Sequence, residues 1–316
     1  MKLTGSFFRL IRWPNLLFIA LTQVLFYYCI ILPSLPAQYY LLPQKLTTAL
    51  FFFLVLASVF IAAAGYIIND YFDINIDQVN KPGKMVVEKI ISRRWAILMH
   101  FVISTIGVAV SLYVSYKTTW IIVLANIGCT LLLWFYSTTF KKKLLSGNII
   151  ISALTAWTVI VLYFATNTSY LNTLSQPSGI IFAMKRIFKF AALYAGFAFI
   201  ISLIREVVKD IEDMEGDTKY NCKTMPIEWG VPAAKVFAGV WLVVLTGAIA
   251  LVVFYMLLSG WWAAALYCLL LIVSLLLILR KLYQAQVTAD YHTISSKIKF
   301  VMLAGILSML LLKLYL

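Results

Sequence analysis

Long apolar stretches recur along the whole chain and are separated by short polar segments. A helix that crosses a membrane needs ~20 mainly apolar residues, and tilting or packing relaxes that requirement. The stretches cover residues 16–32, 46–68, 95–113, 120–139, 149–166, 190–204, 236–258, 261–279 and 300–312. The composition agrees, because 63% of the residues are hydrophobic and only 12% are charged, which is far more apolar than a soluble domain. We therefore predict an all-α, polytopic membrane protein with nine spanning helices.

Basic residues are distributed unevenly between the two ends of these predicted helices. If the N-terminus is cytosolic, most of the 26 Lys and Arg residues fall on the cytosolic side, as the positive-inside rule requires. The opposite side receives Lys45, Lys117, Lys185, Arg186, Lys189 and Lys313. We therefore predict a multi-pass protein of the cell membrane with a cytosolic N-terminus. The net charge of +14 is spread over membrane-proximal loops without a nucleic-acid-binding motif, so we expect membrane lipids as partners and no nucleic acid.

The acidic residues are concentrated in two short clusters, residues 69–77 and 209–217. With the flanking Glu88, Glu206 and Glu228, these clusters contain every acidic residue except Asp290. Both clusters fall on the predicted cytosolic side, at the ends of the second and sixth helices. Three aspartates in each follow the spacing i, i+3, i+7, which on a helix places them within ~60° of arc on one face. They are Asp70, Asp73 and Asp77 in the first cluster and Asp210, Asp213 and Asp217 in the second.

Such a patch of carboxylates is a natural set of ligands for a hard divalent cation. Mg²⁺ takes oxygen ligands, is usually held by one or two carboxylates, and completes its shell with water and substrate phosphates. Simple solvation would not require the same spacing twice at equivalent positions. We therefore predict that the six aspartates hold Mg²⁺ and, through it, a diphosphate. A cation transporter is the rival interpretation, but transported ions usually bind on broken helices near the bilayer midplane, whereas these acids lie at predicted helix ends.

The matching positions of the two clusters predict an internal repeat within one transmembrane domain. Residues 1–145 would form a first four-helix repeat, residues 146–280 a second, and residues 281–316 the region of a ninth helix. The loops after the second and sixth helices would cap a site shared by the repeats. On the opposite side, residues 167–185 are rich in Ser, Thr and Asn and predict a solvated loop.

The two clusters resemble the signature motifs of the UbiA superfamily of intramembrane prenyltransferases. The likeness covers essentially the whole chain and extends through Asn80-Lys81-Pro82 and through Tyr136-Ser137 followed by Lys141. The segment 205–217 is similar to the branch that includes digeranylgeranylglyceryl phosphate synthases. Lys81 stands where many relatives have Arg, and Val86-Val87-Glu88-Lys89 replaces a Ser-Gly segment, at positions we place on the rim of the loop.

This resemblance implies a Mg²⁺-dependent prenyltransferase that releases diphosphate. The donor would be a polyprenyl diphosphate, with geranylgeranyl diphosphate as the leading candidate. The lipophilic acceptor would be a geranylgeranylglyceryl phosphate-type lipid, with an aromatic acceptor of quinone biosynthesis as the alternative. Besides the six aspartates, the residues expected to bind substrate are Asn15, Asn69, Lys81, Lys84, Tyr136, Lys141, Arg205 and Lys209.

Overall fold

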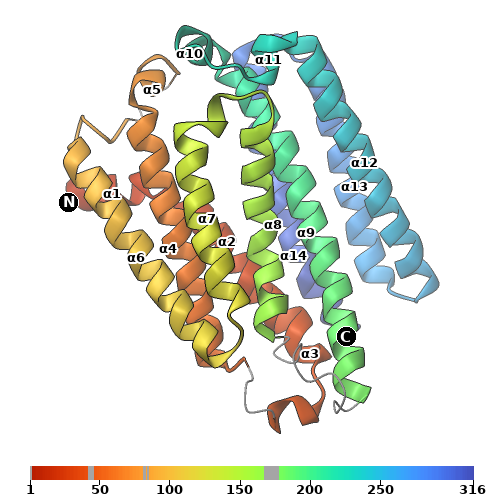
Figure 1. Ribbon diagram of the computed structural model, residues 1–316. Helices are drawn as coiled ribbons and strands as arrows, with labels where there is room; N and C mark the ends of the chain where they lie inside the picture. The colour runs from red at the N-terminus through yellow and green to blue at the C-terminus, as the bar shows by residue number, and fades with distance from the viewer. Residues whose placement is uncertain (1, 42–45, 81–82, 84, 167–177) are drawn as a thin grey trace. The chain divides into compact units, whose positions relative to one another are not determined.

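The computed structural model describes residues 2–41, 46–80, 83, 85–166 and 178–316. These residues form helices without a β-sheet, so the all-α prediction is confirmed (Figure 1). In this part of the chain, nine helices are long and apolar enough to cross a membrane. They are Trp13–Ser34, Thr48–Phe72, Arg93–Lys117, Ile121–Thr138, Ser146–Thr166, Ser178–Glu212, Gly230–Leu258, Trp262–Gln284 and Thr288–Leu312.

Two helices begin much earlier than the apolar pattern predicted, by more than ten residues each. The sixth span, α9 (Ser178–Glu212), starts within the stretch predicted as a loop, so residues 178–185 are helical. The rest of that predicted loop, 167–177, lies outside the described residues. The ninth span, α14 (Thr288–Leu312), begins well before residue 300. Asp290 Oδ2 accepts hydrogen bonds from the backbone N–H groups of Gln286 and Val287 at 2.9 and 3.1 Å. These bonds stabilise the first turn, so the helix starts in a polar segment.

The described chain divides into two compact units. The first comprises Met1–Phe140 and Trp157–Leu193. It contains α1 (Lys2–Leu10), α2 (Trp13–Phe26) with its continuation through a π-helix (Tyr27–Ile31) and α3 (Leu32–Ser34), α4 (Thr48–Phe72), α5 (Ile74–Asn80), α6 (Arg93–Lys117), α7 (Ile121–Thr138), the end of α8 (Ser146–Thr166) and the start of α9.

The second unit comprises Lys141–Ala156 and Tyr194–Leu316. It holds the start of α8, the rest of α9, and then α10 (Met214–Lys219), α11 (Met225–Glu228), α12 (Gly230–Leu258), α13 (Trp262–Gln284) and α14. Within it, α9 and α14 meet through a hydrogen bond of 2.7 Å between Tyr194 Oη and Ser308 Oγ. Gly305 of α14 makes room for Phe197, because a Cβ at that glycine would lie 2.6 Å from the ring.

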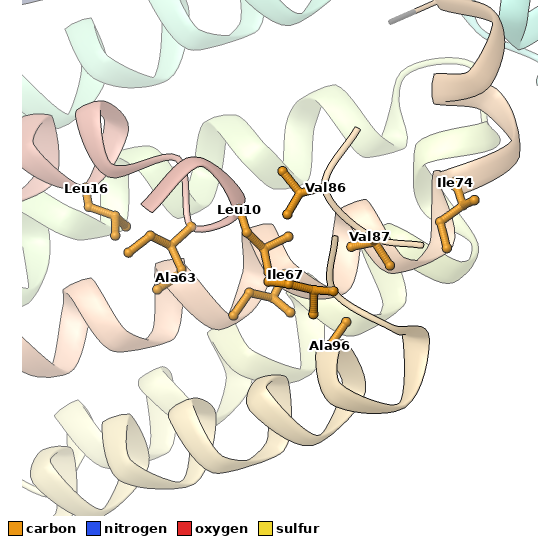
Figure 2. Packing of buried hydrophobic residues seen from close by; sticks show 10 residues of the cluster. Leu10, Leu16, Ala63, Ile67, Ile74, Val86, Val87 and Ala96 are labelled. Atoms are coloured by element: carbon orange, nitrogen blue, oxygen red, sulfur yellow. The ribbon is translucent and has the colours of Figure 1, made fainter. Parts of the chain in front are cut away.

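An apolar cluster in the first unit holds the end of α4, where the first aspartate cluster begins. Leu10 of α1, Ile67 of α4, Ile74 of α5 and Val86 and Val87 of the following loop pack together in it, each almost completely buried (Figure 2). The two valines are therefore core residues and not the loop rim that we predicted. Burying a valine side chain contributes about 1.5–3 kcal/mol, so this loop is anchored against the helix that carries the aspartates.

Polar side chains inside the membrane-spanning helices of the first unit bond to one another. Asn126 of α7 donates to Ser111 of α6 at 2.8 Å and accepts from the indole N–H of Trp157 of α8 at 3.0 Å. Gln23 of α2 donates to Ser58 Oγ of α4 at 3.0 Å. Because a polar group in hydrocarbon is costly without a partner, these bonds fix which helices are neighbours.

The close approach of α4 and α6 depends on Gly107, and this dependence can be tested. A Cβ at Gly107 would lie 2.9 Å from Ile61 Cγ1 and 3.3 Å from the Ile61 backbone nitrogen. We expect Gly107→Ala to lower the free energy of unfolding by about 1–3 kcal/mol through overpacking, measured by thermal unfolding in detergent. The matched control is Gly128→Ala in α7, where a Cβ meets nothing within 4 Å; improved helix propensity should stabilise that variant slightly. Equal unfolding temperatures for the two variants would contradict the packing argument.

Candidate active site

The first aspartate cluster is divided between two helices at its middle residue. Helix α4 ends at Phe72, Asp73 adopts φ −87° and ψ 0°, and α5 begins at Ile74. Our prediction that Asp70, Asp73 and Asp77 share one face of a single helix is therefore wrong. The backbone bonds nevertheless continue through the break, because Asp73 N–H donates to Asn69 O at 3.0 Å and Asp77 N–H donates to Asp73 O at 2.8 Å.

The second cluster breaks in the same way. Helix α9 ends at Glu212, Asp213 adopts φ −94° and ψ 6°, and α10 begins at Met214. Again the bonds continue, with Asp213 N–H donating to Lys209 O at 2.8 Å and Asp217 N–H to Asp213 O at 3.2 Å. Backbone near φ −90°, ψ 0° is sparsely populated and is often found at functional sites. Its occurrence at the same position of both clusters indicates that the break belongs to the motif.

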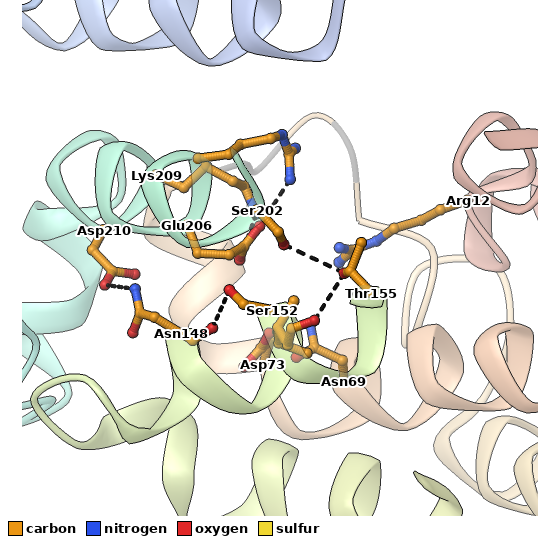
Figure 3. A network of polar contacts seen from close by, with 12 residues as sticks. Arg12, Asn69, Asp73, Asn148, Ser152, Thr155, Ser202, Glu206, Lys209 and Asp210 are labelled. Carbon is orange, nitrogen blue, oxygen red and sulfur yellow. Dashed lines mark hydrogen bonds and ion pairs between the residues drawn. The ribbon is translucent and has the colours of Figure 1, made fainter. Parts of the chain in front are cut away.

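Side-chain bonding at the first break explains part of its geometry. The Asn69 amide donates to Asp73 Oδ2 at 2.6 Å (Figure 3). A short polar side chain that bonds locally competes with regular helix geometry. Asp73 is almost fully buried, whereas Asp70 and Asp77 are partly exposed. In the second cluster it is Asp217 that is buried, and Asp210 and Asp213 are partly exposed.

Asp70 is paired with Arg12, which is not among the residues predicted to bind substrate. Arg12 Nη2 donates to Asp70 Oδ1 at 2.6 Å, and the guanidinium lies 5.2 Å from the centre of the Tyr66 ring. Arg12 joins α1 to α2 in the left-handed conformation, with φ 51°. Burial alone lowers the pKa of its guanidinium, but the charge and hydrogen bond of Asp70, together with smaller contributions from Tyr66 and Asp73, outweigh this and raise the pKa above its ordinary value. The side chain is therefore always charged and neutralises Asp70.

Asp210 has a neutral partner in place of the arginine. The amide of Asn148, a buried residue in the first turn of α8, donates to Asp210 Oδ2 at 2.7 Å (Figure 3). Sequence reasoning missed Asn148. One signal could have found it: Asn148 is the third residue of its helix, as Asn15 is the third residue of α2.

Two cations predicted to bind substrate, Arg205 and Lys209, both lie within ion-pair distance of Glu206. Arg205 Nη1 lies 2.8 Å from Glu206 Oε1, and Lys209 Nζ lies 3.9 Å from Glu206 Oε2 (Figure 3). We had not included Glu206 among the site residues. Arg205 Nε is buried and has no hydrogen-bond partner within the described chain, so the guanidinium retains an unused donor.

The remaining predicted substrate-binding residues lie at helix ends or outside the described chain. Asn15 is partly buried in the first turn of α2, and Tyr136 is partly buried in the last turn of α7. Lys141 lies in the 3₁₀ turn Phe140–Lys142 that follows α7. Lys81 and Lys84 fall outside the described residues.

The oxygen-rich clusters suit Mg²⁺ in the chemistry of their donors. Asn69 Oδ1, next to Asp70, is buried and has no hydrogen-bond partner in the part of the chain that the structure describes; such an acceptor is available to a cation or to water. Within the same residues, no group of three or more His, Cys, Asp or Glu side chains is placed to hold a metal. Because Mg²⁺ usually takes one or two carboxylates and leaves the other positions to water and phosphate oxygens, the donors that are present still fit this ion.

The membrane-spanning architecture and the paired aspartate clusters point to one family of membrane proteins. The sequence model of the UbiA prenyltransferase family matches residues 30–306, so the chain belongs to this family. Together with the nine apolar helices in the described chain, this makes it a multi-pass membrane protein.

One relative of known name is the digeranylgeranylglyceryl phosphate synthase of Thermococcus sibiricus, which is 32% identical over 189 residues. The alignment covers 60% of this chain and 58% of that protein. The digeranylgeranylglyceryl phosphate synthase of Thermococcus gammatolerans is 34% identical over 168 residues, covering 53% of this chain and 52% of the relative. The chain thus matches less than two thirds of the length of these relatives.

Solved structures share the fold along nearly the whole chain. One comes from work on the biosynthesis of digeranylgeranylglyceryl phosphate synthase in membranes; it has a TM-score of 0.64 and 21% identity and covers 100% of both chains. A UbiA homolog from Archaeoglobus fulgidus bound to GPP and Mg²⁺ has a TM-score of 0.57 and 16% identity, covering 96% of this chain and 99% of the homolog.

The ion pair at the first cluster can be tested by its effect on stability. Arg12→Gln leaves Asp70 without its cation, and since the two side chains are 35% and 19% exposed, we expect a loss of about 1–2 kcal/mol in the free energy of unfolding. Thermal unfolding in detergent measures it. Arg9→Gln, on the exposed side of α1, is the matched control and should change little. If the pair is the cause, Arg12→Gln in an Asp70→Asn background should cost much less; an unchanged cost would rule out the coupling.

Proposed function

We propose that the protein catalyses the Mg²⁺-dependent transfer of a polyprenyl group from its diphosphate to a lipophilic acceptor. Geranylgeranyl diphosphate is the leading donor, and a geranylgeranylglyceryl phosphate-type lipid is the leading acceptor. The observation that carries the proposal is the pair of aspartate clusters, each divided at its middle aspartate, in a chain of the UbiA prenyltransferase family.

The known relatives support the choice of substrates. Those reported above are digeranylgeranylglyceryl phosphate synthases, and the Archaeoglobus fulgidus homolog binds GPP together with Mg²⁺. GPP is an allylic diphosphate, and the oxygen donors of both clusters suit the cation that such a diphosphate carries. An aromatic acceptor of quinone biosynthesis remains the alternative.

The aspartates of the two clusters would hold the metal, with Asn69 Oδ1 as an additional oxygen donor. When bound, Mg²⁺ supplies positive charge that stabilises the departing diphosphate. The reaction breaks the bond between the allylic carbon and the diphosphate oxygen and forms a bond from that carbon to an acceptor oxygen, whose proton is released. Asp70 and Asp210 would be positioned by Arg12 and Asn148, the partners that orient their carboxylates.

Cations beside the clusters would balance the charge of the leaving diphosphate. Arg205 and Lys209 have this role in the proposal, with Glu206 holding both side chains in place. Lys81, Lys84 and Lys141 are further candidates, and Tyr136 would shield the allylic cation with the face of its ring. Asn15 would contact the acceptor. The clusters and the N-terminus would face the cytosol, as the distribution of Lys and Arg favours.

The direct experiment incubates purified protein with labelled prenyl diphosphates, Mg²⁺ and a panel of lipid and aromatic acceptors. Formation of a prenylated lipid supports the proposal, and a prenylated aromatic product would move the assignment to the alternative acceptor. EDTA should stop turnover and excess Mg²⁺ should restore it. Absence of any prenylated product, with uptake of the cation into vesicles, would favour the transporter that the sequence left open.

The two middle aspartates provide the first mutational test. We expect Asp73→Ala and Asp213→Ala each to reduce turnover by at least ~100-fold, because each variant loses a ligand that positions the metal charge. If both clusters act on the same diphosphate, the double variant should lose little beyond the worse single variant. Thermal unfolding of the purified proteins controls for misfolding. Turnover like the wild type in either single variant would defeat the metal-diphosphate assignment.

The lysine triplet at residues 141–143 provides a test of the acceptor. Lys142 and Lys143 are exposed, and Lys142 O accepts the N–H of Lys223 at 2.8 Å. If these cations bind an acceptor phosphate, replacing all three with Gln should raise the acceptor KM before the donor KM, and added salt should weaken the effect. The control, Arg280→Gln with Lys281→Gln, removes exposed charge elsewhere. A change confined to the donor KM would assign the triplet to the diphosphate.

A further inference from the structure

Arg186 of α9 has no carboxylate partner among the residues that the structure describes. The sequence contains no Asp or Glu before Asp70, between Glu88 and Glu206, between Glu228 and Asp290, or after Asp290. The segments predicted to lie on the side of the membrane away from the aspartate clusters therefore contain no acidic side chain. The Arg186 side chain is partly buried. A cation that has lost part of its water without gaining an anion is unfavourable.

The hydrogen bonds of Arg186 are also incomplete. Nη2 donates to the backbone oxygen of Ser34, at the end of α3, at 3.0 Å. Arg186 Nε and Ser34 Oγ are both buried, and neither has a hydrogen-bond partner among the described residues. Two residues in contact thus each retain an unsatisfied polar atom. An oxyanion, with its several acceptor oxygens, is the chemical group that could accept from the unsatisfied Arg186 donor.

Two further cations flank the arginine. Lys185 and Lys189 are exposed on the same helix, four residues apart, which makes them neighbours of like charge and mildly destabilising. Among the described residues, no acidic side chain balances these three positive charges within five residues. This concentration of charge favours a bound anion.

The position along α9 and an apolar neighbour indicate where that anion comes from. Arg186 and Asp210 belong to one helix, and a helix rises ~36 Å over the interval between them, which exceeds the ~30 Å hydrocarbon core of a bilayer. Arg186 is therefore at the headgroup level opposite the clusters, where the start of α9 and α3 lie near each other (Figure 1). Phe188, two residues nearer the membrane centre on the same helix, is 54% exposed and can contact acyl chains.

We propose that Arg186, with Lys185 and Lys189 at its rim, binds the phosphate group of an anionic phospholipid at the membrane surface opposite the aspartate clusters. The planar guanidinium matches phosphate with paired N–H donors. Because Nε is covered, the headgroup would engage the exposed part of the guanidinium first, and a small rotation of the side chain would then bring Nε to the phosphate. This site is separate from the proposed reaction and does not depend on it.

Hydrogen–deuterium exchange of the start of α9 tests the proposal locally, without interference from the many cytosolic cations. The protein is placed in nanodiscs of phosphatidylcholine alone or of phosphatidylcholine with phosphatidylglycerol. We expect phosphatidylglycerol to slow exchange in residues 178–190 by about fivefold in the wild type. The effect should be lost in Arg186→Gln and kept in Lys117→Gln, a control that removes an exposed cation from the end of α6 on the same predicted side.

A parallel arm adds inorganic phosphate to phosphatidylcholine nanodiscs. If phosphate alone slows exchange as much as phosphatidylglycerol, dissolved phosphate is the ligand and the lipid assignment is overturned. If Arg186→Gln also speeds exchange in residues 200–212, it has disturbed the fold, and Lys185→Gln with Lys189→Gln replaces it; that variant should lose part of the protection. Equal protection by phosphatidylglycerol in the wild type and the variants would overturn the proposal entirely.

Discussion

Hydrocarbon offers no partner to a peptide group, and the rest of this structure depends on that constraint. Each spanning segment must satisfy its backbone hydrogen bonds internally, so helices are the only local solution for segments this apolar. The same constraint limits how a functional site can be introduced. At Asp73 and Asp213 the chain leaves helical geometry, yet the backbone bonds on both sides of each residue persist. The backbone is thus irregular at these two aspartates, while the N–H groups of Asp73, Asp77, Asp213 and Asp217 remain hydrogen-bonded.

Neutralisation and anchoring act together at the end of α4. The charge of Asp70 is balanced by Arg12, and the residue next to Arg12 in the sequence, Ile11, belongs to the apolar cluster that also contains Ile67 and Val87. The cluster fixes where α1 and the loop after α5 lie. With α1 in this position, the left-handed backbone at Arg12 places the guanidinium against the Asp70 carboxylate. Packing and electrostatics are therefore inseparable here, because the ion pair needs the apolar contacts to hold its geometry.

The spanning helices could be predicted because length and hydropathy are properties of contiguous residues. Even there, the start of α14 was missed, since the polar segment that begins it becomes helical through the side chain of Asp290. The aspartate clusters could be found from their spacing, but the break in the helix at the middle aspartate of each cluster could not. A straight helix and a helix interrupted at position i+3 can carry the same i, i+3, i+7 spacing. The two differ only in the backbone angles φ and ψ at the interruption. The sequence did not indicate the roles of Arg12 and Asn148, because their partners, Asp70 and Asp210, are distant in sequence. It did not indicate the role of Glu206, because that role depends on the orientation of its carboxylate toward Arg205 and Lys209.

The interruption at Asp73 also has a mechanical consequence. Asp70 is carried by a long helix fixed among its neighbours, whereas Asp77 is carried by the seven-residue α5. The two carboxylates thus lie on different helices, and backbone hydrogen bonds continue between these helices through Asp73. A ligand that binds both Asp70 and Asp77 would restrain the angle between α4 and α5. A ligand bound by both carboxylates would therefore link α4 to α5 directly, in addition to the apolar contacts of Ile74 that already hold α5 in the cluster.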